Sequence, residues 1–502
     1  MNKWLISLAV ILPTLIEVID TSVVNVSLDH IRGSLSAGLD EATWAITAYL
    51  VSNAIIIPIT GWLTRIFGRK RYLMFSIILF TVSSLMCGLS GSLASLIFFR
   101  VLQGIGGGGL QPISQSILLE TFPVEQHGMA MALFGVGVMF GPIIGPILGG
   151  WITDTWSWNW IFFINIPIGI ISCVLIWMFI QDPPYLKRIR ARIDYAGLFL
   201  IAAGLGCLQV VLDKGQREDW FSSGFIVWMS LIAACALIAF IIVELRSPEP
   251  VVNLRAFKNR SFSSGNIIMF ISFFVLFGSI VLIPLYLQQL MGYNAFLAGL
   301  ALAPGGIATL IAMPVAGKLV SKINPKWILI TGIFVSAYSS FMMAQFNIYT
   351  DFDMVVRSRF IMGIGMGLVF IPLTNLTLST IRKEEMGNAT GIFNLLRNLG
   401  GSFGVAFVTT LLVRRGQFHQ SRLGEHLHSL DPHYQAGLGY LSGRTGMHTE
   451  SATGFIYQNL IRQSSMFAFS DAFYISGVIM ICIIPLVFLM RRGVNNSGVS
   501  VH

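Results

Sequence analysis

The sequence predicts an all-α polytopic membrane protein in which fourteen spans form two six-helix bundles and one additional pair. Composition, long apolar runs and an internal repeat support this prediction. Only 11% of the 502 residues are charged, and 55% are hydrophobic. A soluble chain carries about 25% charged residues. The mean hydropathy is +0.75, which excludes an ordinary soluble domain.

Apolar runs long enough to cross a bilayer recur along the whole chain. A helical span needs about 20 predominantly apolar residues. The first run is too long for a signal-peptide core and lacks a convincing cleavage site, so we expect a retained span. The fourteen predicted spans lie near 4–28, 44–64, 72–92, 94–119, 129–152, 161–181, 194–212, 223–245, 264–287, 296–317, 327–346, 354–379, 389–413 and 468–490.

Basic residues concentrate in alternate short loops, as the positive-inside rule describes. The loop after the second span carries Arg69 and Lys70, and the loop after the tenth carries Lys318 and Lys322. This asymmetry predicts that both termini are cytoplasmic. It also explains the net charge of +9 without a nucleic-acid partner.

An internal repeat with an offset of 259 residues divides the chain. Arg100 is echoed by Arg359, and the same offset relates the glycines listed here: Gly104, Gly106, Gly108, Gly128, Gly141 and Gly145 with Gly363, Gly365, Gly367, Gly387, Gly400 and Gly404. The repeat predicts two parallel six-span bundles, 1–192 and 247–502. Residues 193–246 then form two additional linker spans.

The first span carries two carboxylates, Glu17 and Asp20, three residues apart and therefore on one helix face. An ionised carboxylate costs roughly 2.5 kcal/mol or more at the bilayer centre. A carboxyl group that gains and loses a proton is the physical requirement for proton coupling. We therefore predict that Asp20 and Glu17 couple transport to protons. The alternative is a hydrated or arginine-paired carboxylate near the outer mouth.

Two arginines, Arg100 and Arg397, also lie inside apolar runs and need a partner or a watery cavity. Gln103 and Gln111 share a sector with Arg100 at 100° per residue. We expect a substrate cavity formed by Arg100, Gln103, Gln111, Asn394 and Arg397. Arg397 would hold an anionic substrate group or a carboxylate of the other half, or form a structural ion pair. The 21 Met and 37 Phe residues suit an adaptable apolar pocket, although most must pack or face lipid.

A glycine and proline pattern marks the fifth span. Its glycines recur every fourth residue and share one helix face, so another helix can approach closely. Each proline removes a backbone donor and bends the helix. Close packing and a moving seal between two halves are both open readings. The predicted gating residues are Gly137, Gly141, Pro142, Gly145, Pro146 and Gly149.

Gly61 and Gly68 frame a predicted tight cytoplasmic turn after the second span. Arg65 and Arg69 belong to a basic cluster that meets the anionic inner membrane surface. These four residues form the cytoplasmic-loop motif.

Several chemistries lack their motifs. The chain contains no G-x-x-x-x-G-K-[ST], G-x-S-x-G or H-E-x-x-H sequence. Its five cysteines lie inside apolar spans without a C-x-x-C pair. We therefore predict neither an enzyme nor an ATP-driven pump, with no metal or other cofactor and the proton gradient as the energy source.

These motifs resemble the major facilitator superfamily, and within it the fourteen-span drug:proton antiporters of the EmrB/QacA type. The resemblance covers nearly the whole chain and is strongest to the EmrB multidrug export proteins. It rests on Asp20-Thr21 with Asn25, Gly61 to Arg71, Arg100 to Gly108, Gly137 to Pro142, Gly149-Gly150, Trp160 to Gly169, Asp219 to Ser223 and Asn394 to Ser402.

The resemblance implies a major facilitator fold and a proton-coupled multidrug efflux transporter. Such a protein exports hydrophobic or amphipathic compounds across the bacterial inner membrane by alternating access. It also implies that the extracytoplasmic loop at about 414–467 meets a periplasmic adaptor protein and an outer-membrane channel. Arg65 stands where the family usually has Asp, which leaves the usual latch between the halves in doubt. The alternatives are a narrow-specificity exporter of a fatty acid or metabolite, and a non-transporting membrane receptor.

Overall fold

The computed structural model describes residues 2–123, 126–183, 194–425, 427–428, 431–445 and 448–490. For some helical residues within these ranges it describes the backbone alone, namely Leu39, Phe140, Pro142, Ile143, Pro146, Ala295, Arg444 and Thr445. Every regular element in the described ranges is a helix. The predicted domain boundary at 192/193 lies outside the described residues.

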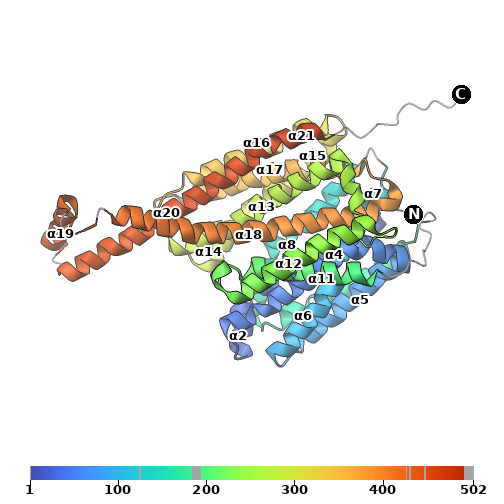
Figure 1. Cartoon of the computed structure of the whole chain (residues 1–502), viewed down its shortest axis with the longest axis horizontal. Helices are drawn as coiled ribbons and strands as arrows, with labels where there is room; N and C mark the ends of the chain where they lie inside the picture. Colours follow the sequence, from blue (N-terminus) through green and yellow to red (C-terminus); the bar gives the residue numbers. More distant parts are fainter. Residues whose placement is uncertain are drawn as a thin grey trace.

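The helices of the N-terminal half, residues 3–179, form one bundle (Figure 1). They are α1 (Lys3–Val26), α2 (Leu28–Ser34), α3 (Leu39–Ala42), α4 (Trp44–Phe67), α5 (Arg69–Gly88), α6 (Leu93–Gly107), α7 (Leu110–Thr121), α8 (His127–Thr155), α9 (Trp160–Phe163) and α10 (Asn165–Phe179).

The linker and the C-terminal half, residues 260–489, follow. The linker contains α11 (Tyr195–Lys214), η2 (Trp220–Ser222), α12 (Gly224–Arg246) and η3 (Leu254–Lys258). The C-terminal half contains α13 (Arg260–Gln289), α14 (Ala295–Leu300), α15 (Ala303–Val320), α16 (Pro325–Ala344), α17 (Phe352–Leu378), η4 (Lys383–Glu385), α18 (Met386–Gly424), α19 (Pro432–Thr445), α20 (Thr449–Cys482) and α21 (Ile484–Leu489).

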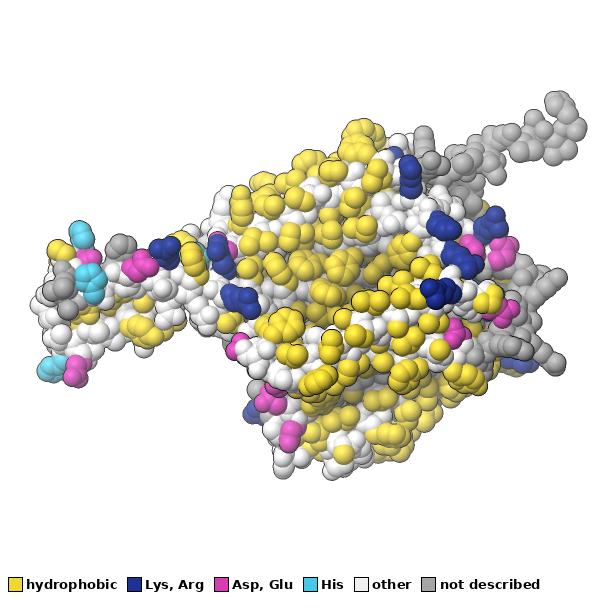
Figure 2. All heavy atoms as spheres, in the orientation of Figure 1, with side chains coloured by type: hydrophobic (Ala, Val, Ile, Leu, Met, Phe, Trp, Pro, Cys, Tyr) yellow, Lys and Arg dark blue, Asp and Glu magenta, His cyan; other side chains and the backbone are white. Residues whose placement is uncertain are grey.

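Thirteen helical segments in the described ranges are long and apolar enough to cross a membrane. The 29-residue helix α8 occupies the place of the predicted fifth span, so the prediction of an all-α polytopic membrane protein is confirmed. Figure 2 shows a broad band of hydrophobic side chains across the bundle. Trp177, Phe199 and Trp228, for example, are each at least 65% exposed, as expected for side chains that face lipid.

The N-terminus and α21 lie at the same end of the bundle, which we call the terminal end (Figure 1). A long helical hairpin extends from the opposite end, which we call the hairpin end. The hairpin is built by the distal parts of α18 and α20, with α19 at its tip. The predicted loop at about 414–467 is therefore largely helical, because both flanking spans continue well past their apolar stretches.

Two glycine contacts close the halves against each other at the terminal end. A Cβ atom at Gly61 of α4 would lie 2.6 Å from the backbone nitrogen of Asn388 in α18. A Cβ atom at Gly128 of α8 would lie 2.6 Å from the carbonyl oxygen of Gly317 in α15. Because no side chain fits in either place, backbone meets backbone, and we call these two contacts the terminal seal.

The linker pair packs on both halves. Gln209 of α11 donates a hydrogen bond to Ser402 of α18 at 3.0 Å. Thr47 of α4 donates one to Asp213 at the end of α11. The Trp220 indole nitrogen donates to Thr410 of α18 at 2.9 Å. The pair therefore bridges the N-terminal and C-terminal halves along one side.

Candidate functional site

The carboxylate of Asp20 lies inside the N-terminal half, where three side chains donate to it. Arg100 Nη1 of α6 binds Oδ2 at 2.6 Å. Gln103 Nε2 of α6 and Asn165 Nδ2 of α10 each bind Oδ1 at 2.9 Å. All four residues are at most 1% exposed. Asp20 therefore accepts all three of these hydrogen bonds, one of them from a charged guanidinium.

Arg100 is fixed from a second direction by α4. Its Nε donates to the carbonyl oxygen of Ala45 at 3.1 Å, and its guanidinium lies 4.1 Å from the ring centroid of Tyr49. Arg100 and Gln103 were predicted from the sequence to line the substrate cavity. The structure places both beside Asp20 within one half, where the carboxylate balances the charge of Arg100, and their role in a substrate cavity stays a prediction.

The second carboxylate, Glu17, has a donor set of its own. The Tyr49 hydroxyl donates to Oε1 at 3.2 Å, and Asn53 Nδ2 donates to the same oxygen at 3.1 Å. Gln111 Nε2 of α7 donates to Oε2. Tyr49 thus stacks on the arginine of the Asp20 pocket and binds Glu17, so it links the two carboxylate sites.

Two glutamines of α7 extend the polar network across the interface between the halves. Gln111 Oε1 accepts a hydrogen bond from Arg397 Nη2 of α18. One turn later, Gln115 Oε1 accepts from Asn394 Nδ2 of α18 at 2.6 Å. Arg397 is 3% exposed, and its Nη1 has no hydrogen-bond partner in the described part of the chain. Three predicted cavity residues, Gln111, Asn394 and Arg397, therefore meet at this interface.

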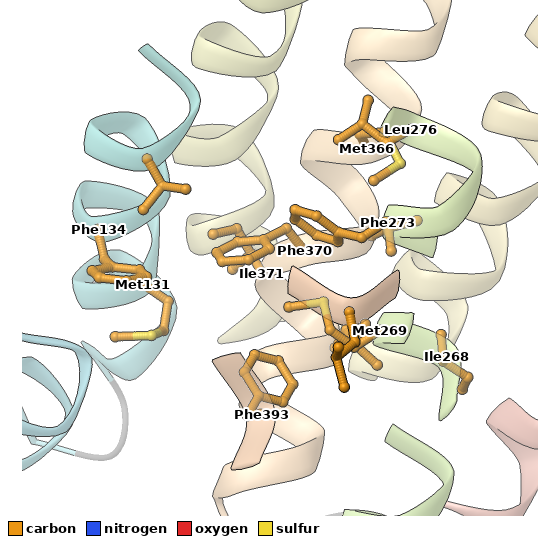
Figure 3. Close-up of a cluster of buried hydrophobic side chains, with 14 of the residues drawn as sticks. Met131, Phe134, Ile268, Met269, Phe273, Leu276, Met366, Phe370, Ile371 and Phe393 are labelled. Carbon is orange, nitrogen blue, oxygen red and sulfur yellow. The ribbon is translucent and has the colours of Figure 1, made fainter. Parts of the chain in front are cut away.

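An apolar cluster borders this polar network (Figure 3). Its labelled members come from α8, α13, α17 and α18, and all are buried. The Arg397 guanidinium lies 5.6 Å from the Phe273 ring centroid, so the cluster and the network meet at Arg397. Apolar surface beside a donor without a partner is chemically suited to a molecule with an apolar body and a polar head. The labelled residues are Met131, Phe134, Ile268, Met269, Phe273, Leu276, Met366, Phe370, Ile371 and Phe393.

The glycine face of α8 packs on α1, the helix that carries both carboxylates. A Cβ atom at Gly141 would lie 2.4 Å from Val18, and one at Gly145 would lie 2.3 Å from Ser22. A Cβ atom at Gly137 would lie 3.0 Å from Ile11, and one at Gly149 would lie 3.1 Å from Val23. The glycine face therefore allows close packing of α8 on α1. The gating role of these glycines stays a prediction. The helix continues through Pro142 and Pro146, whose side chains lie outside the described atoms.

The cytoplasmic-loop motif lies at the terminal end. Gly68 ends α4 with φ of +86°, a left-handed conformation that favours glycine. Arg69 forms a two-pronged ion pair with Glu120 of α7, with both N–O distances 2.7 Å. Arg65 is exposed, and Gly61 belongs to the terminal seal.

Sequence reasoning missed several residues of this network. Tyr49 and Asn53 lie four residues apart on α4, and Gln115 and Glu120 lie on α7. The available signal was the spacing of polar residues inside apolar runs, which places Tyr49 and Asn53 on one helix face. Asn165 entered only as part of a family motif, although it donates directly to Asp20.

The comparisons with known proteins agree with this architecture. A family model described as Major Facilitator Superfamily matches residues 10–405. Two solved structures share the fold with a TM-score of 0.60. The human organic anion transporter MFSD10 is 11% identical, with 96% of this chain and 100% of that chain covered. The proton:xylose symporter XylE is 15% identical, with 96% of each chain covered. The chain belongs to the major facilitator superfamily, a family of membrane transporters rather than enzymes.

Within that family the chain is similar to named export and resistance proteins over nearly its full length. It is 37% identical to the Multidrug export protein EmrB of Escherichia coli (strain K12), covering 99% of this chain and 98% of that protein. It is 35% identical to the Fatty acid resistance protein FarB of Neisseria gonorrhoeae, covering 98% and 97%. The resemblance to EmrB-type proteins stated from the motifs is confirmed.

Proposed function

We propose that this protein is a proton-driven exporter of hydrophobic or amphipathic toxic compounds, working by alternating access between its two halves. The observation that carries the proposal is the buried Asp20 carboxylate, which is bound by Arg100, Gln103 and Asn165 inside an apolar bundle. A buried ionisable group in a membrane span is costly and marks ion pathways and proton relays. Asp20 is therefore the proton carrier in this mechanism, together with Glu17.

The substrate, in this proposal, occupies the interface between the apolar cluster and the polar network. Met131, Phe273 and Phe393 supply apolar surface that adapts to different shapes, and Arg397 and Asn394 supply polar contacts. Similarity to the Multidrug export protein EmrB supports a broad range of compounds.

A narrower substrate class is the second candidate. The Nη1 group of Arg397 is buried without a partner in the described structure, and a carboxylate would satisfy it. Similarity to the Fatty acid resistance protein FarB favours a fatty acid as the anion.

We further propose that the protein lies in a bacterial inner membrane with the terminal end in the cytoplasm. The helical hairpin then projects into the periplasm. Its exposed apolar side chains, including Phe455 and Tyr457, supply a surface on which a periplasmic adaptor protein and an outer-membrane channel assemble.

Proton movement in energised inverted membrane vesicles tests the proposal. We expect added drugs to release protons from vesicles with the wild-type protein and not from vesicles with Asp20→Asn. The control is Asp154→Asn, which changes an exposed carboxylate at the end of α8 whose side chain is 74% exposed. Release that survives in Asp20→Asn would move the coupling to another group. A folded wild-type protein that gives no release with any drug would contradict proton-driven drug export.

A further inference from the structure

The side-chain amide of Gln111 lies between a carboxylate of one half and a guanidinium of the other. Its Nε2 donates to Glu17 Oε2, and its Oε1 accepts from Arg397 Nη2. Gln111 is 8% exposed. We propose that Gln111 is the positioning residue that converts protonation of Glu17 into release of Arg397, and so into opening of the terminal seal. This inference rests on the proposed function for the role of Glu17 as a proton carrier.

The amide has one orientation that satisfies both neighbours. A guanidinium has donors only, so Gln111 must turn its oxygen toward Arg397. Its NH2 group then points at Glu17, which must accept. Tyr49 and Asn53 also donate to Glu17. In the observed arrangement Glu17 accepts all three hydrogen bonds, as an ionised carboxylate does.

Proton uptake at Oε2 of Glu17 breaks this arrangement. The new O–H group would face the NH2 group of Gln111, donor against donor. Rotating the amide by half a turn would relieve that conflict, but it would turn the NH2 group toward Arg397, where it again meets a donor. Because a buried polar group without a partner costs about 1–3 kcal/mol, the contact between Gln111 and Arg397 is lost when Glu17 carries the proton on this oxygen.

Other charged and titratable groups surround Glu17 without crossing the interface. Asp20 lies on the same helix, Arg100 on α6 and Tyr49 on α4. Their contacts described above are all within the N-terminal half. Arg397 is the charged group that faces Glu17 from α18. Protonation of Asp20 would rearrange one half, whereas protonation of Glu17 changes a bond between the halves.

The contacts of the terminal seal are the ones that protonation of Glu17 would weaken. Helix α18 carries Arg397 and, two to three turns earlier, Gly387 and Asn388, which pack against Gly61. Release of Arg397 removes a polar contact that holds α18 against the N-terminal half. The protonated protein therefore favours opening at the terminal end, where a drug would enter, and ionisation of Glu17 favours the closed seal.

Spin labels across the seal test the inference without any transported compound. Cysteines introduced at Arg65 and Glu384, both exposed, would carry the labels, with the five native cysteines replaced by alanine. Distances would be measured by double electron–electron resonance in lipid nanodiscs from alkaline to acid pH. The labelled protein that keeps Glu17 and Gln111 should show a shift to longer distances between the labels as the pH falls. Gln111→Leu should lose this pH dependence, as should Glu17→Gln, which cannot titrate.

The matched control is Gln115→Leu, one turn along the same helix. It removes another hydrogen bond between the halves, to Asn394 at 2.6 Å, without touching a carboxylate. We expect it to keep the pH-dependent shift. Gln111→Asn, a shorter amide that cannot reach both neighbours, provides a second test if Gln111→Leu does not fold.

An unchanged shift in Gln111→Leu or Gln111→Asn would overturn the inference. So would a wild-type distance that does not change with pH, or a shift that is lost in Asp20→Asn but kept in Glu17→Gln. The vesicle assay separates this inference from the proposed function. A normal pH-dependent shift without drug-dependent proton release would contradict proton-driven drug export and leave the switch standing.

Discussion

Arg100 pairs with Asp20 at a place where both side chains are buried. A buried ion pair adds little net stability because both charges lose hydration, but removing one partner costs about 3–5 kcal/mol. Arg100 also satisfies the Ala45 carbonyl and stacks on Tyr49. The pair therefore constrains how α1, α4 and α6 pack together. Its importance for stability becomes measurable when one partner is removed and the other charge is left buried.

We predict that Arg100→Gln lowers the stability of the purified protein by about 3 kcal/mol or more. The double variant Asp20→Asn/Arg100→Gln should recover part of the loss, because it leaves no unpaired charge. Thermal unfolding in detergent, followed by loss of monodisperse protein, measures both.

The repeat-related Arg359 supplies the control for this experiment. It is also buried, but its Nη1 donates to the Ser279 hydroxyl at 3.0 Å rather than to a carboxylate. Adding Asp20→Asn to Arg359→Gln should give no recovery. Equal recovery in both backgrounds would show that Asp20→Asn stabilises the protein for a reason unrelated to Arg100.

At this scale the sequence was informative about charges and uninformative about their neutral partners. Glu17, Asp20, Arg100 and Arg397 stood out because a charge in an apolar run has a large energetic cost. Tyr49 has no such cost, so its contact with both carboxylate sites emerged only from the fold. The sequence also could not distinguish the arginine beside Asp20 from the one at the interface, since that depends on helix packing.

Helix α8 packs closely on two neighbouring helices because its glycines lack side chains. Its glycine face lies on α1, and Gly128 near its start lies on α15 of the other half. From the sequence, close packing and a moving seal were both open interpretations of the glycine face. The structure shows the packing, and a substitution in α8 tests the movement.

We predict that Gly128→Ala shifts the protein toward the state that is open at the terminal end. Its Cβ would lie 2.6 Å from the Gly317 oxygen, and overpacking of this kind costs about 1–3 kcal/mol. The open population should rise about fivefold or more. The measurement is the rate at which a thiol reagent labels Thr64→Cys, a buried position at the seal, in the cysteine-free background.

Gly150→Ala is the control on the same helix, because a Cβ there meets nothing within 4 Å. It should leave the labelling rate unchanged. If Gly128→Ala also leaves that rate unchanged while the protein stays folded, the contact between α8 and α15 does not control opening.

Hydropathy predicted the spans well because a helix in lipid satisfies its own backbone hydrogen bonds and exposes long runs of apolar side chains. It failed where helices leave the lipid. The apolar signal of the thirteenth span ends near residue 413, whereas α18 continues to Gly424. Past residue 413, contacts between α18 and α20 stabilise both helices. Arg415 and His419 of α18 both bind Asp471 of α20, at 2.6 and 2.7 Å, and no hydropathy pattern encodes that pairing.

For the whole molecule, the proposed function assigns transport to the helical bundle and adaptor binding to the hairpin. We predict that replacing 425–448 with a short Gly/Ser linker leaves drug-dependent proton release in inverted vesicles intact. Resistance of whole cells to the same drugs should fall, because the replacement removes α19, which is part of the proposed adaptor surface. Loss of both activities would instead place the hairpin tip in the transport cycle itself.

Helix α18 has a mechanical consequence because it is continuous. It starts at the terminal seal, carries Asn394 and Arg397 at the interface, and ends in the hairpin. Its 39 residues span about 58 Å at 1.5 Å per residue. Tilting such a lever by about 10° about one end displaces the other by about 10 Å. Opening or closing of the terminal end would therefore move the hairpin. A protein bound to the hairpin would be displaced with it, and its position would depend on whether the terminal end is open or closed.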